Sequence, residues 1–437
     1  MDPGLPYQCP KDLGREQRGI NLACHLNACA GYVAAGNFTN ADLEFQCISH
    51  LSSPDGDAIQ RMAAYMSEAL SFRMFKHFPG ACEIIMNSSS RMSNSEELLV
   101  KNLFFKLCPF LKVLYLIINQ AIAQIMEGEK MVHIIDLNAS EPAQWINLLK
   151  TRKGGPPQLN ITVIHEKKEV LEQIGLQLIR EAENLEFPFR FNPIVSKLQD
   201  LDFEILPVKP GEALAISSVL QLHSLLAVDD EMLAWSSPAA LQNLQRAVHM
   251  NQRTFGELIQ KDKINAYILS PDSALSPLSL GASPKMGNFL HDLWKLRPKL
   301  IVITEHEADL NGSNLIERVD RASHYYGSLF DCLESTVPRT SSERQKLERM
   351  LFGEEIKNII ACEGIKRKER HEKLEKWIPR LESSGFGKIS FCQDAMHEAK
   401  NLLQNYGHGF KLREENGCLF ICWNDKALFS ISAWRFR

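Results

Sequence analysis

The feature that most constrains the fold is a short apolar run that ends on a carboxylate. Residues 131–137 read Met-Val-His-Ile-Ile-Asp-Leu, and Gln144 and Trp145 follow shortly after. A strand that is apolar nearly throughout is typical of a parallel sheet covered on both faces. In open α/β sheets, ligands bind outside the carboxyl ends of such strands. The run therefore predicts a buried strand with Asp136 at its tip, where a ligand site could form.

Further apolar runs alternate with helical patterns along the chain. The predicted strands are 161–165, 189–195, 213–220 and 300–305, and the predicted helices between them begin at 144 and 170, with a short one at 221–227. Strands that alternate with helices indicate parallel βαβ units. The end of the chain differs, because 417–423 and 427–434 flank a turn at 424–426 and indicate an antiparallel hairpin. The expected fold class is α/β, with a methyltransferase-like (Rossmann-type), mostly parallel sheet that ends in an antiparallel hairpin.

The first hundred residues predict an N-terminal α-helical cap instead. Expected helices cover 15–35, 41–51 and 57–78, and Thr39 or Asn40 could cap the second of them. A further helix is expected at 109–127, and the stretch 270–284 indicates a surface loop. We expect a short tail at 1–15 and a single domain over 16–437.

Bulk properties exclude some functions. The formal net charge is −4 and the pI is near 6.4, which argues against a mainly electrostatic grip on nucleic acid. We expect no secretory signal and no membrane segment. The 11 cysteines form no Cys-x-x-Cys pair, so we expect no metal site built on them and reduced thiols in the cytosol or nucleus.

Two carboxylates are the candidates for cofactor binding. In a methyltransferase, Asp136 would end the first strand and Glu166, after the second strand, would hold ribose hydroxyls. That chemistry needs glycine in the first loop, and 137–144 contains none. The sequence therefore favours a structural role for Asp136, as a cap on the following helix, and no cofactor. Standard catalytic patterns are also absent from the sequence, which favours a protein that is not an enzyme.

Other candidate sites each have a structural alternative. His133 is expected to be a hydrogen-bonded core residue. The heptad-spaced leucines of 171–185 and the Leu-x-x-Leu-Leu pattern at 222–226 are expected to pack in the core. A basic cluster could serve as a nuclear import signal or contact phosphate, or it could be a solvated helix whose charges pair with interleaved glutamates; it comprises Lys366, Arg367, Lys368 and Arg370.

Short motifs, taken in order along the chain, resemble the GRAS family of plant transcriptional regulators. The motifs that carry the resemblance are Leu22–Asn37, Ser53–Asp57, the central signature Val132, His133, Ile134, Ile135 and Asp136 with Gln144 and Trp145, Leu171–Asn192, Tyr325–Tyr326, Arg370–Glu372, and the closing Ser432, Ala433 and Trp434. By this resemblance the domain divides into leucine-rich region I (20–83), a central region (102–167), leucine-rich region II (170–209), a PFYRE-like region (218–357) and a SAW-like region (360–437).

The resemblance implies a regulator of transcription that acts in the nucleus through protein partners. Expected partners are other GRAS-family proteins, in homo- or hetero-oligomers, and zinc-finger transcription factors, with DNA contacted mostly indirectly and no membrane. A role in gibberellin response or root development is implied as well. Two alternatives remain open: an S-adenosylmethionine-dependent methyltransferase-like enzyme, and a factor that binds DNA directly.

Overall fold

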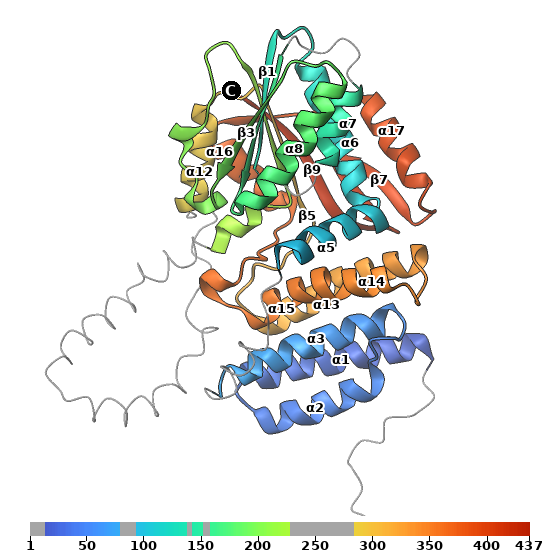
Figure 1. The fold of residues 1–437 in the computed structure, drawn as a ribbon. Helices are drawn as coiled ribbons and strands as arrows, with labels where there is room; N and C mark the ends of the chain where they lie inside the picture. The colour runs from blue at the N-terminus through green and yellow to red at the C-terminus, as the bar shows by residue number, and fades with distance from the viewer. Residues whose placement is uncertain (1–13, 79–92, 138–141, 152–157, 228–283) are drawn as a thin grey trace, which may run out of the picture.

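One nine-stranded sheet dominates the fold. The computed structural model describes residues 14–78, 93–137, 142–151, 158–227 and 284–437. The strand order is β3-β2-β1-β4-β5-β9-β8-β7, and β6 pairs with β9. In Figure 1 the sheet and its covering helices lie above, the N-terminal helices lie below, and a layer of later helices lies between them. The expected tail at 1–15 and loop at 270–284 fall almost entirely outside the described residues.

The parallel half of the sheet confirms the strands expected from the apolar runs. Its strands are β1 (Met131–Asp136), β2 (Gln158–His165), β3 (Phe189–Val195), β4 (Ala213–Val219) and β5 (Leu300–His306). β1 pairs in parallel with β2 on one side and with β4 on the other. The tip of β1 therefore lies in the middle of the parallel part, where the carboxyl ends of neighbouring strands meet.

The antiparallel half is larger than the sequence suggested. It contains β6 (Phe386–Ile389), β7 (Phe410–Glu415), β8 (Cys418–Trp423) and β9 (Lys426–Phe436). The predicted hairpin is β8 and β9, and β9 pairs antiparallel with β5. The additional strand β7 joins β8 through a turn at Asn416 and Gly417, where φ is 52° and 79°. Glycine suits the second of these positions because it has no Cβ to clash there.

Helices cover both faces of the sheet, as expected for an apolar parallel sheet. One face carries α6 (Phe110–Ile125), α7 (Ala143–Thr151), α8 (Lys168–Asn184) and α17 (Gln393–Gln404), and the other carries α12 (Pro284–Lys295) and α16 (Leu374–Ser383). Successive strand residues point to opposite faces. Ile134 accordingly packs in the first hydrophobic core and Ile135 in the second.

The cap is helical, as the sequence predicted. It contains α1 (Arg15–Ala34), α2 (Phe38–Leu51) and α3 (Ala58–Phe75). The cap on α2 is Asn37, whose side chain accepts a hydrogen bond from the backbone of Asn40, and not Thr39 or Asn40 as expected. The reason is that α2 begins three residues earlier than predicted.

The middle layer was not predicted. It consists of α5 (Asn94–Leu107), α13 (Leu315–Thr336), α14 (Ser342–Leu347), the π-helical η5 (Glu348–Gly353) and α15 (Glu354–Ala361). Short 3-10 turns occur at η1 (Leu198–Asp200), η2 (Phe203–Ile205), η3 (Leu222–Leu225) and η6 (Gly364–Lys366). α3 and α1 pack on this layer, so the layer joins the cap to the sheet (Figure 1).

A buried ion pair joins the cap to the middle layer. The guanidinium of Arg61 on α3 is fully buried and donates to both carboxylate oxygens of Glu348, at 3.0 and 3.2 Å from Nε. It also donates to Glu334 at 2.7 Å. Charged groups buried in this way must stay paired, because an isolated buried charge is very unfavourable. The pairing fixes how α3 sits on α13 and η5.

Among the residues that the structure describes, no single helix is both long and apolar enough to cross a membrane. α5 and α6 together have sufficient length and apolar composition, but the pair is bent by 83°. All nine cysteines in the described segments are free thiols.

Candidate functional site

The central signature motif forms the core strand of the sheet. Val132, Ile134 and Ile135 are fully buried. The carboxylate of Asp136 accepts a hydrogen bond of 2.8 Å from the indole Nε1 of Trp145 on α7. The carboxylate therefore ties β1 to the first turn of α7, in the kind of structural role that the sequence favoured.

Gln144, beside Trp145, has a similar structural role. Its backbone carbonyl accepts a hydrogen bond of 2.8 Å from the side chain of Asn119 on α6. Trp145 thus connects α7 to β1, and Gln144 connects α7 to α6 on the same face of the sheet. The motif positions α7 against β1 and α6.

His133 is a hydrogen-bonded core residue, as the sequence suggested. Its Nδ1 lies 2.8 Å from a carboxylate oxygen of Glu212, and its Nε2 lies 2.7 Å from the hydroxyl of Thr162. Burial lowers the pKa of His133, and this effect outweighs the opposite effect of Glu212. A neutral imidazole that donates from Nδ1 to Glu212 and accepts at Nε2 satisfies both contacts.

A cavity of about 390 Å³ lies at the carboxyl ends of the parallel strands, facing the middle layer. Residues at or just beyond the ends of all five parallel strands contribute to its wall, namely Leu137, Ile164, His165, Glu166, Ser196, Val219, Leu220 and His306. Ligands of open α/β sheets bind at this position. Of the two candidate carboxylates, Glu166 lines the cavity and is exposed, whereas Asp136 is buried against Trp145.

This arrangement does not fit S-adenosylmethionine. The loop after β1 contains no glycine that would let the backbone approach a cofactor. The carboxylate at the tip of β1 is engaged by an indole of the next helix. We therefore derive no methyl-transfer step from Asp136 and Glu166.

Three buried histidines lie close together beside this cavity, and two of them, His223 and His306, line its wall. His223 follows β4 on η3, His306 ends β5, and His371 lies in the loop before α16. The rings of His306 and His371 stack with centroids 4.0 Å apart, and those of His223 and His371 lie 4.4 Å apart. Burial, together with the neighbouring imidazoles, holds the pKa of His306 and His371 well below the usual value.

The carboxylates beside His223 shift its pKa in the opposite direction. Burial alone would lower its pKa, but Glu305 and Glu369 outweigh burial and raise the pKa to about 10. The carboxylates lie 2.7 and 3.2 Å from Nδ1 and Nε2 of this ring. Nearby, burial raises the pKa of Glu355 to about 8, and the charge of Glu369 adds to this shift. Nothing in the sequence marked this group, because its members come from segments separated by as many as 148 positions (223 to 371).

The basic cluster is not a solvated helix, so that alternative was wrong, and only part of the cluster is exposed. Arg367 and Arg370 are only 2% and 0% exposed, and the segment is a 3-10 turn followed by an extended loop. Arg367 donates to backbone carbonyls of Leu310, Asn311 and Gly312.

Arg370 is engaged in the same way. It donates to the carbonyls of Arg367 and Gly364 and to the side chain of Asn311. The two guanidiniums therefore organise two loops from within the protein. Only Lys366 and Lys368 remain exposed for phosphate or an import receptor.

The closing motif is also internal. Ser432, Ala433 and Trp434 lie on β9 opposite Ile303, Val302 and Ile301 of β5. Trp434 is fully buried, and its Nε1 donates to the hydroxyl of Ser432 at 2.9 Å. This tryptophan therefore packs the C-terminal hairpin onto the core.

The leucine patterns are also explained mainly by packing. All three leucines of Leu222, Leu225 and Leu226 are buried. Leu171 and Leu178 on α8 are buried against the sheet, whereas Leu185, just past the helix, is 42% exposed. α8 is therefore a helix packed on the sheet, as expected, with part of its surface left open.

Comparison with known proteins identifies the class. Residues 22–435 match the GRAS domain family. The chain is 60% identical to the GRAS family protein TF80 of Medicago truncatula, with both chains covered completely. It is 50% identical to Scarecrow-like protein 3 of Arabidopsis thaliana, over 99% of this chain and 92% of that protein. The DELLA protein GAI1 of Vitis vinifera is 29% identical, over 96% of this chain and 62% of that protein.

A solved structure shares the fold. The crystal structure of SCL7 from Oryza sativa superposes with a TM-score of 0.72 at 25% identity, over 95% of this chain and 99% of that one. The chain belongs to the GRAS domain family, a family of plant transcriptional regulators. The signature motifs that identify it are thus residues that build the core.

Proposed function

We propose that this chain regulates transcription in the nucleus by binding other proteins through the open surface of α8. The partner classes are other GRAS-family proteins and zinc-finger transcription factors. Support for the class comes from family membership. Support for the surface comes from the exposed apolar side chains that the fold leaves on this helix.

The observation that carries the proposal is an apolar pair on the outer side of α8. Leu176 is 70% exposed and Ile179 is 43% exposed. They lie three residues apart and so share one side of the helix. The opposite side is buried against the sheet, through residues such as Leu171, Ile174 and Leu178. Neither exposed side chain is needed for that packing, and an isolated domain gains nothing by exposing both.

The charges beside this pair define the partner's chemistry. Glu172, Arg180 and Glu183 are exposed on the same side of α8, within two turns of the apolar pair, and Glu172 pairs with Lys168 at 3.4 Å. The rim around the apolar pair therefore carries charges of both signs. A matching partner surface would cover the apolar pair and place charges of opposite sign against this rim, which suits a protein surface better than the uniform negative charge of DNA phosphate.

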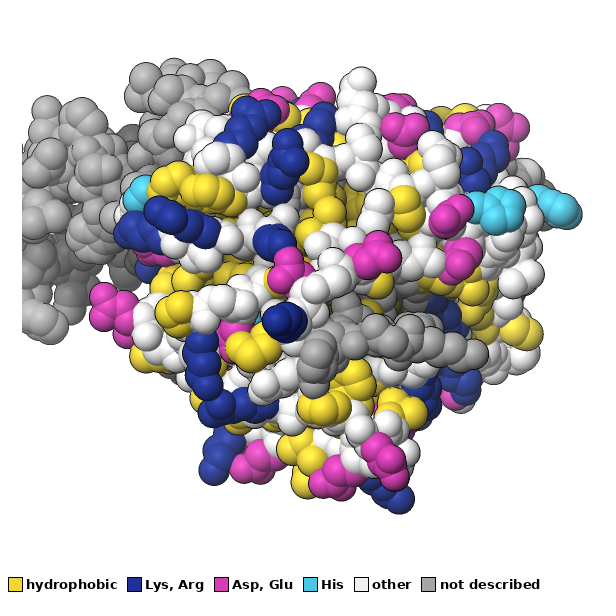
Figure 2. Space-filling model, turned by 90° about the horizontal axis from the view of Figure 1, so that it is seen from above, with side chains coloured by type: hydrophobic (Ala, Val, Ile, Leu, Met, Phe, Trp, Pro, Cys, Tyr) yellow, Lys and Arg dark blue, Asp and Glu magenta, His cyan; other side chains and the backbone are white. Residues whose placement is uncertain are grey.

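Indirect contact with DNA agrees with the overall charge. The net charge is −4. On the face seen from above, opposite the cap, basic and acidic side chains are interspersed (Figure 2). Two of the four residues first considered for phosphate contact are buried. We therefore propose that partners bring this chain to promoters.

A reporter assay in plant cells tests the function. Wild type, Leu176→Ser/Ile179→Ser and the matched control Gln173→Ser/Gln177→Ser would each be expressed with a candidate partner. Gln173 and Gln177 are exposed on the same helix, so the control makes the same number of substitutions at exposed positions of α8. We expect the control to alter reporter output as wild type does and the apolar variant to have lost that effect. Equal output from all three proteins at equal nuclear abundance would contradict the proposal.

A further inference from the structure

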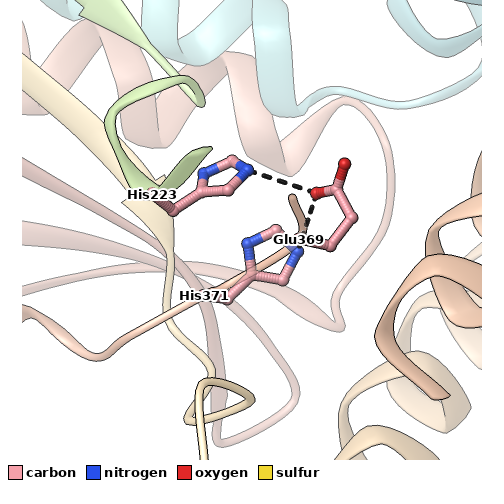
Figure 3. Close-up of side chains that lie close together, drawn as sticks. All are labelled: His223, Glu369 and His371. Atoms are coloured by element: carbon pink, nitrogen blue, oxygen red, sulfur yellow. Dashed lines mark hydrogen bonds and ion pairs between the residues drawn. The ribbon is translucent and has the colours of Figure 1, made fainter. Parts of the chain in front are cut away.

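A group of side chains beside the cavity has the composition of a metal site. His223 comes from η3 after β4, and Glu369 and His371 come from the loop between η6 and α16 (Figure 3). Each offers one ligand atom, and the three atoms lie within 4.8 Å of one another. Two imidazoles and one carboxylate are the donors of several zinc sites. Figure 3 shows the three side chains turned toward one another.

The spacing of the donor atoms is close to what a tetrahedral ion requires. One carboxylate oxygen of Glu369 lies 3.2 Å from Nε2 of His223 and 3.4 Å from Nε2 of His371. Zinc binds nitrogen and oxygen at about 2.0–2.2 Å, so neighbouring ligand atoms of a tetrahedron lie about 3.3 Å apart. Two of the three edges therefore already have the required length. The third edge, between the two imidazoles, is at most 4.8 Å, so binding of an ion would draw the two rings closer together.

His371 gives an independent reason to expect a ligand. Its side chain is fully buried, yet neither ring nitrogen has a hydrogen-bond partner. The approach of Nε2 to Glu369 lacks hydrogen-bond geometry. Buried polar side chains nearly always have a partner. An ion held between Glu369 and the two imidazoles would give Nε2 of His371 the partner that it lacks.

The surroundings of His223 are those of a metal ligand. Its Nδ1 lies 2.7 Å from Glu305, whose carboxylate also accepts from the backbone N–H of Leu222 at 2.7 Å. Histidine ligands commonly donate their second ring N–H to a carboxylate, which fixes the ring and makes the first nitrogen a better donor. Glu305 orients Nε2 of His223 toward Glu369 in this way.

We propose that His223, Glu369 and His371 bind a divalent transition-metal ion, for which zinc is the best fit. Calcium and magnesium fit poorly because they prefer oxygen ligands. His223 and Glu369 both line the cavity, so the fourth position would face it and accept water or a ligand. The ion would hold the loop before α16 against η3, just beyond the end of β4.

Zinc titration of the full chain, stripped with a chelator, tests the site. We expect one zinc ion per chain and a higher melting temperature in its presence, because a ligand that binds only the folded state stabilises it. His371→Ala should lose this binding, and Glu305→Gln should weaken it by about 10- to 100-fold. The control is His324→Ala on α13, an exposed histidine, which should bind zinc as wild type does.

Two further measurements keep the result unambiguous. Glu369 is only partly buried, so Glu369→Gln tests the site if His371→Ala fails to fold. The chain has 11 cysteines, so the cobalt complex should be examined for a thiolate charge-transfer band, which nitrogen and oxygen ligands do not give. Absence of zinc binding, unchanged binding in both folded variants, or a thiolate band that carries all of the binding would each overturn the proposal. The first outcome would leave His223 as an imidazolium between two carboxylates.

Discussion

Single buried charges decide how the layers of this protein fit together. The sequence showed Arg61 and Glu348 only as two charged residues in different regions. In the fold they form a two-point ion pair that is almost completely enclosed. A pairing of this kind could not be predicted, because 287 positions separate the partners and nothing local marks either of them.

Arg61→Ala should therefore be strongly destabilising. Removal of one member of a buried pair typically lowers the free energy of unfolding by about 3–5 kcal/mol, since the other charge is left buried. Urea unfolding of the full chain measures the change. The matched control is Lys106→Ala, which removes the exposed partner of Glu343 and should cost about 0–1 kcal/mol. Equal effects of the two variants would show that the Arg61 pair does not hold the cap.

His133 should make stability depend on pH. Its pKa is lowered in the folded protein, while the unfolded chain binds a proton near pH 6.5. Unfolding therefore takes up a proton below that pH, and stability is lost as the pH falls through 6.5. One such group can change the free energy of unfolding by at most about 1.4 kcal/mol per pH unit.

The variant His133→Gln removes this contribution. Between about pH 7.5 and 5.5 its free energy of unfolding should fall less steeply than that of wild type. His324→Gln, at an exposed position, should keep the wild-type slope. Parallel slopes for wild type and His133→Gln would mean that this imidazole titrates normally in the fold.

Elements differed in how well the sequence predicted them. β1, β2, β4 and β5 were found because their residues are mostly apolar and buried on both faces, and β3, a partly exposed edge strand, was predicted with the observed bounds. β7 was missed because it reads Phe-Lys-Leu-Arg-Glu-Glu at the sheet edge, where charged residues are common. The Asn416-Gly417 pair was an available signal for its turn, since Asn-Gly strongly favours a tight hairpin.

The same substitution should have opposite effects in two elements. Gly417→Ala places a side chain at φ 79° in the β7–β8 turn, and its cost should be about 1–2 kcal/mol. Gly287→Ala lies on α12, where nothing stands within 4 Å of the added carbon, and should stabilise by about 0.5–1 kcal/mol. Thermal unfolding of both variants gives the comparison. A neutral or stabilising Gly417→Ala would contradict the turn described here.

For the whole molecule, family motifs and working surfaces lie in different places. The sequence motifs were conspicuous because they build the core around β1 and β9, and the fold class followed from them. The proposed sites are formed by packing. The surface on α8 is defined by which residues the sheet leaves uncovered, and the metal site is defined by loops that meet only in the fold. Helical periodicity and spacing along the chain show neither which side of α8 the sheet leaves uncovered nor which loops meet in the fold.

The proposed mechanism depends on the outer side of α8, and direct binding tests it most directly. Calorimetry would measure the affinity of the purified chain for whichever GRAS-family or zinc-finger factor binds it most tightly in a panel of both classes. We predict that Leu176→Ser/Ile179→Ser weakens binding at least about tenfold, or ~1.4 kcal/mol, while Gln173→Ser/Gln177→Ser binds as wild type does. Absence of binding to either class, or equal affinity of the apolar variant and wild type, would contradict the account.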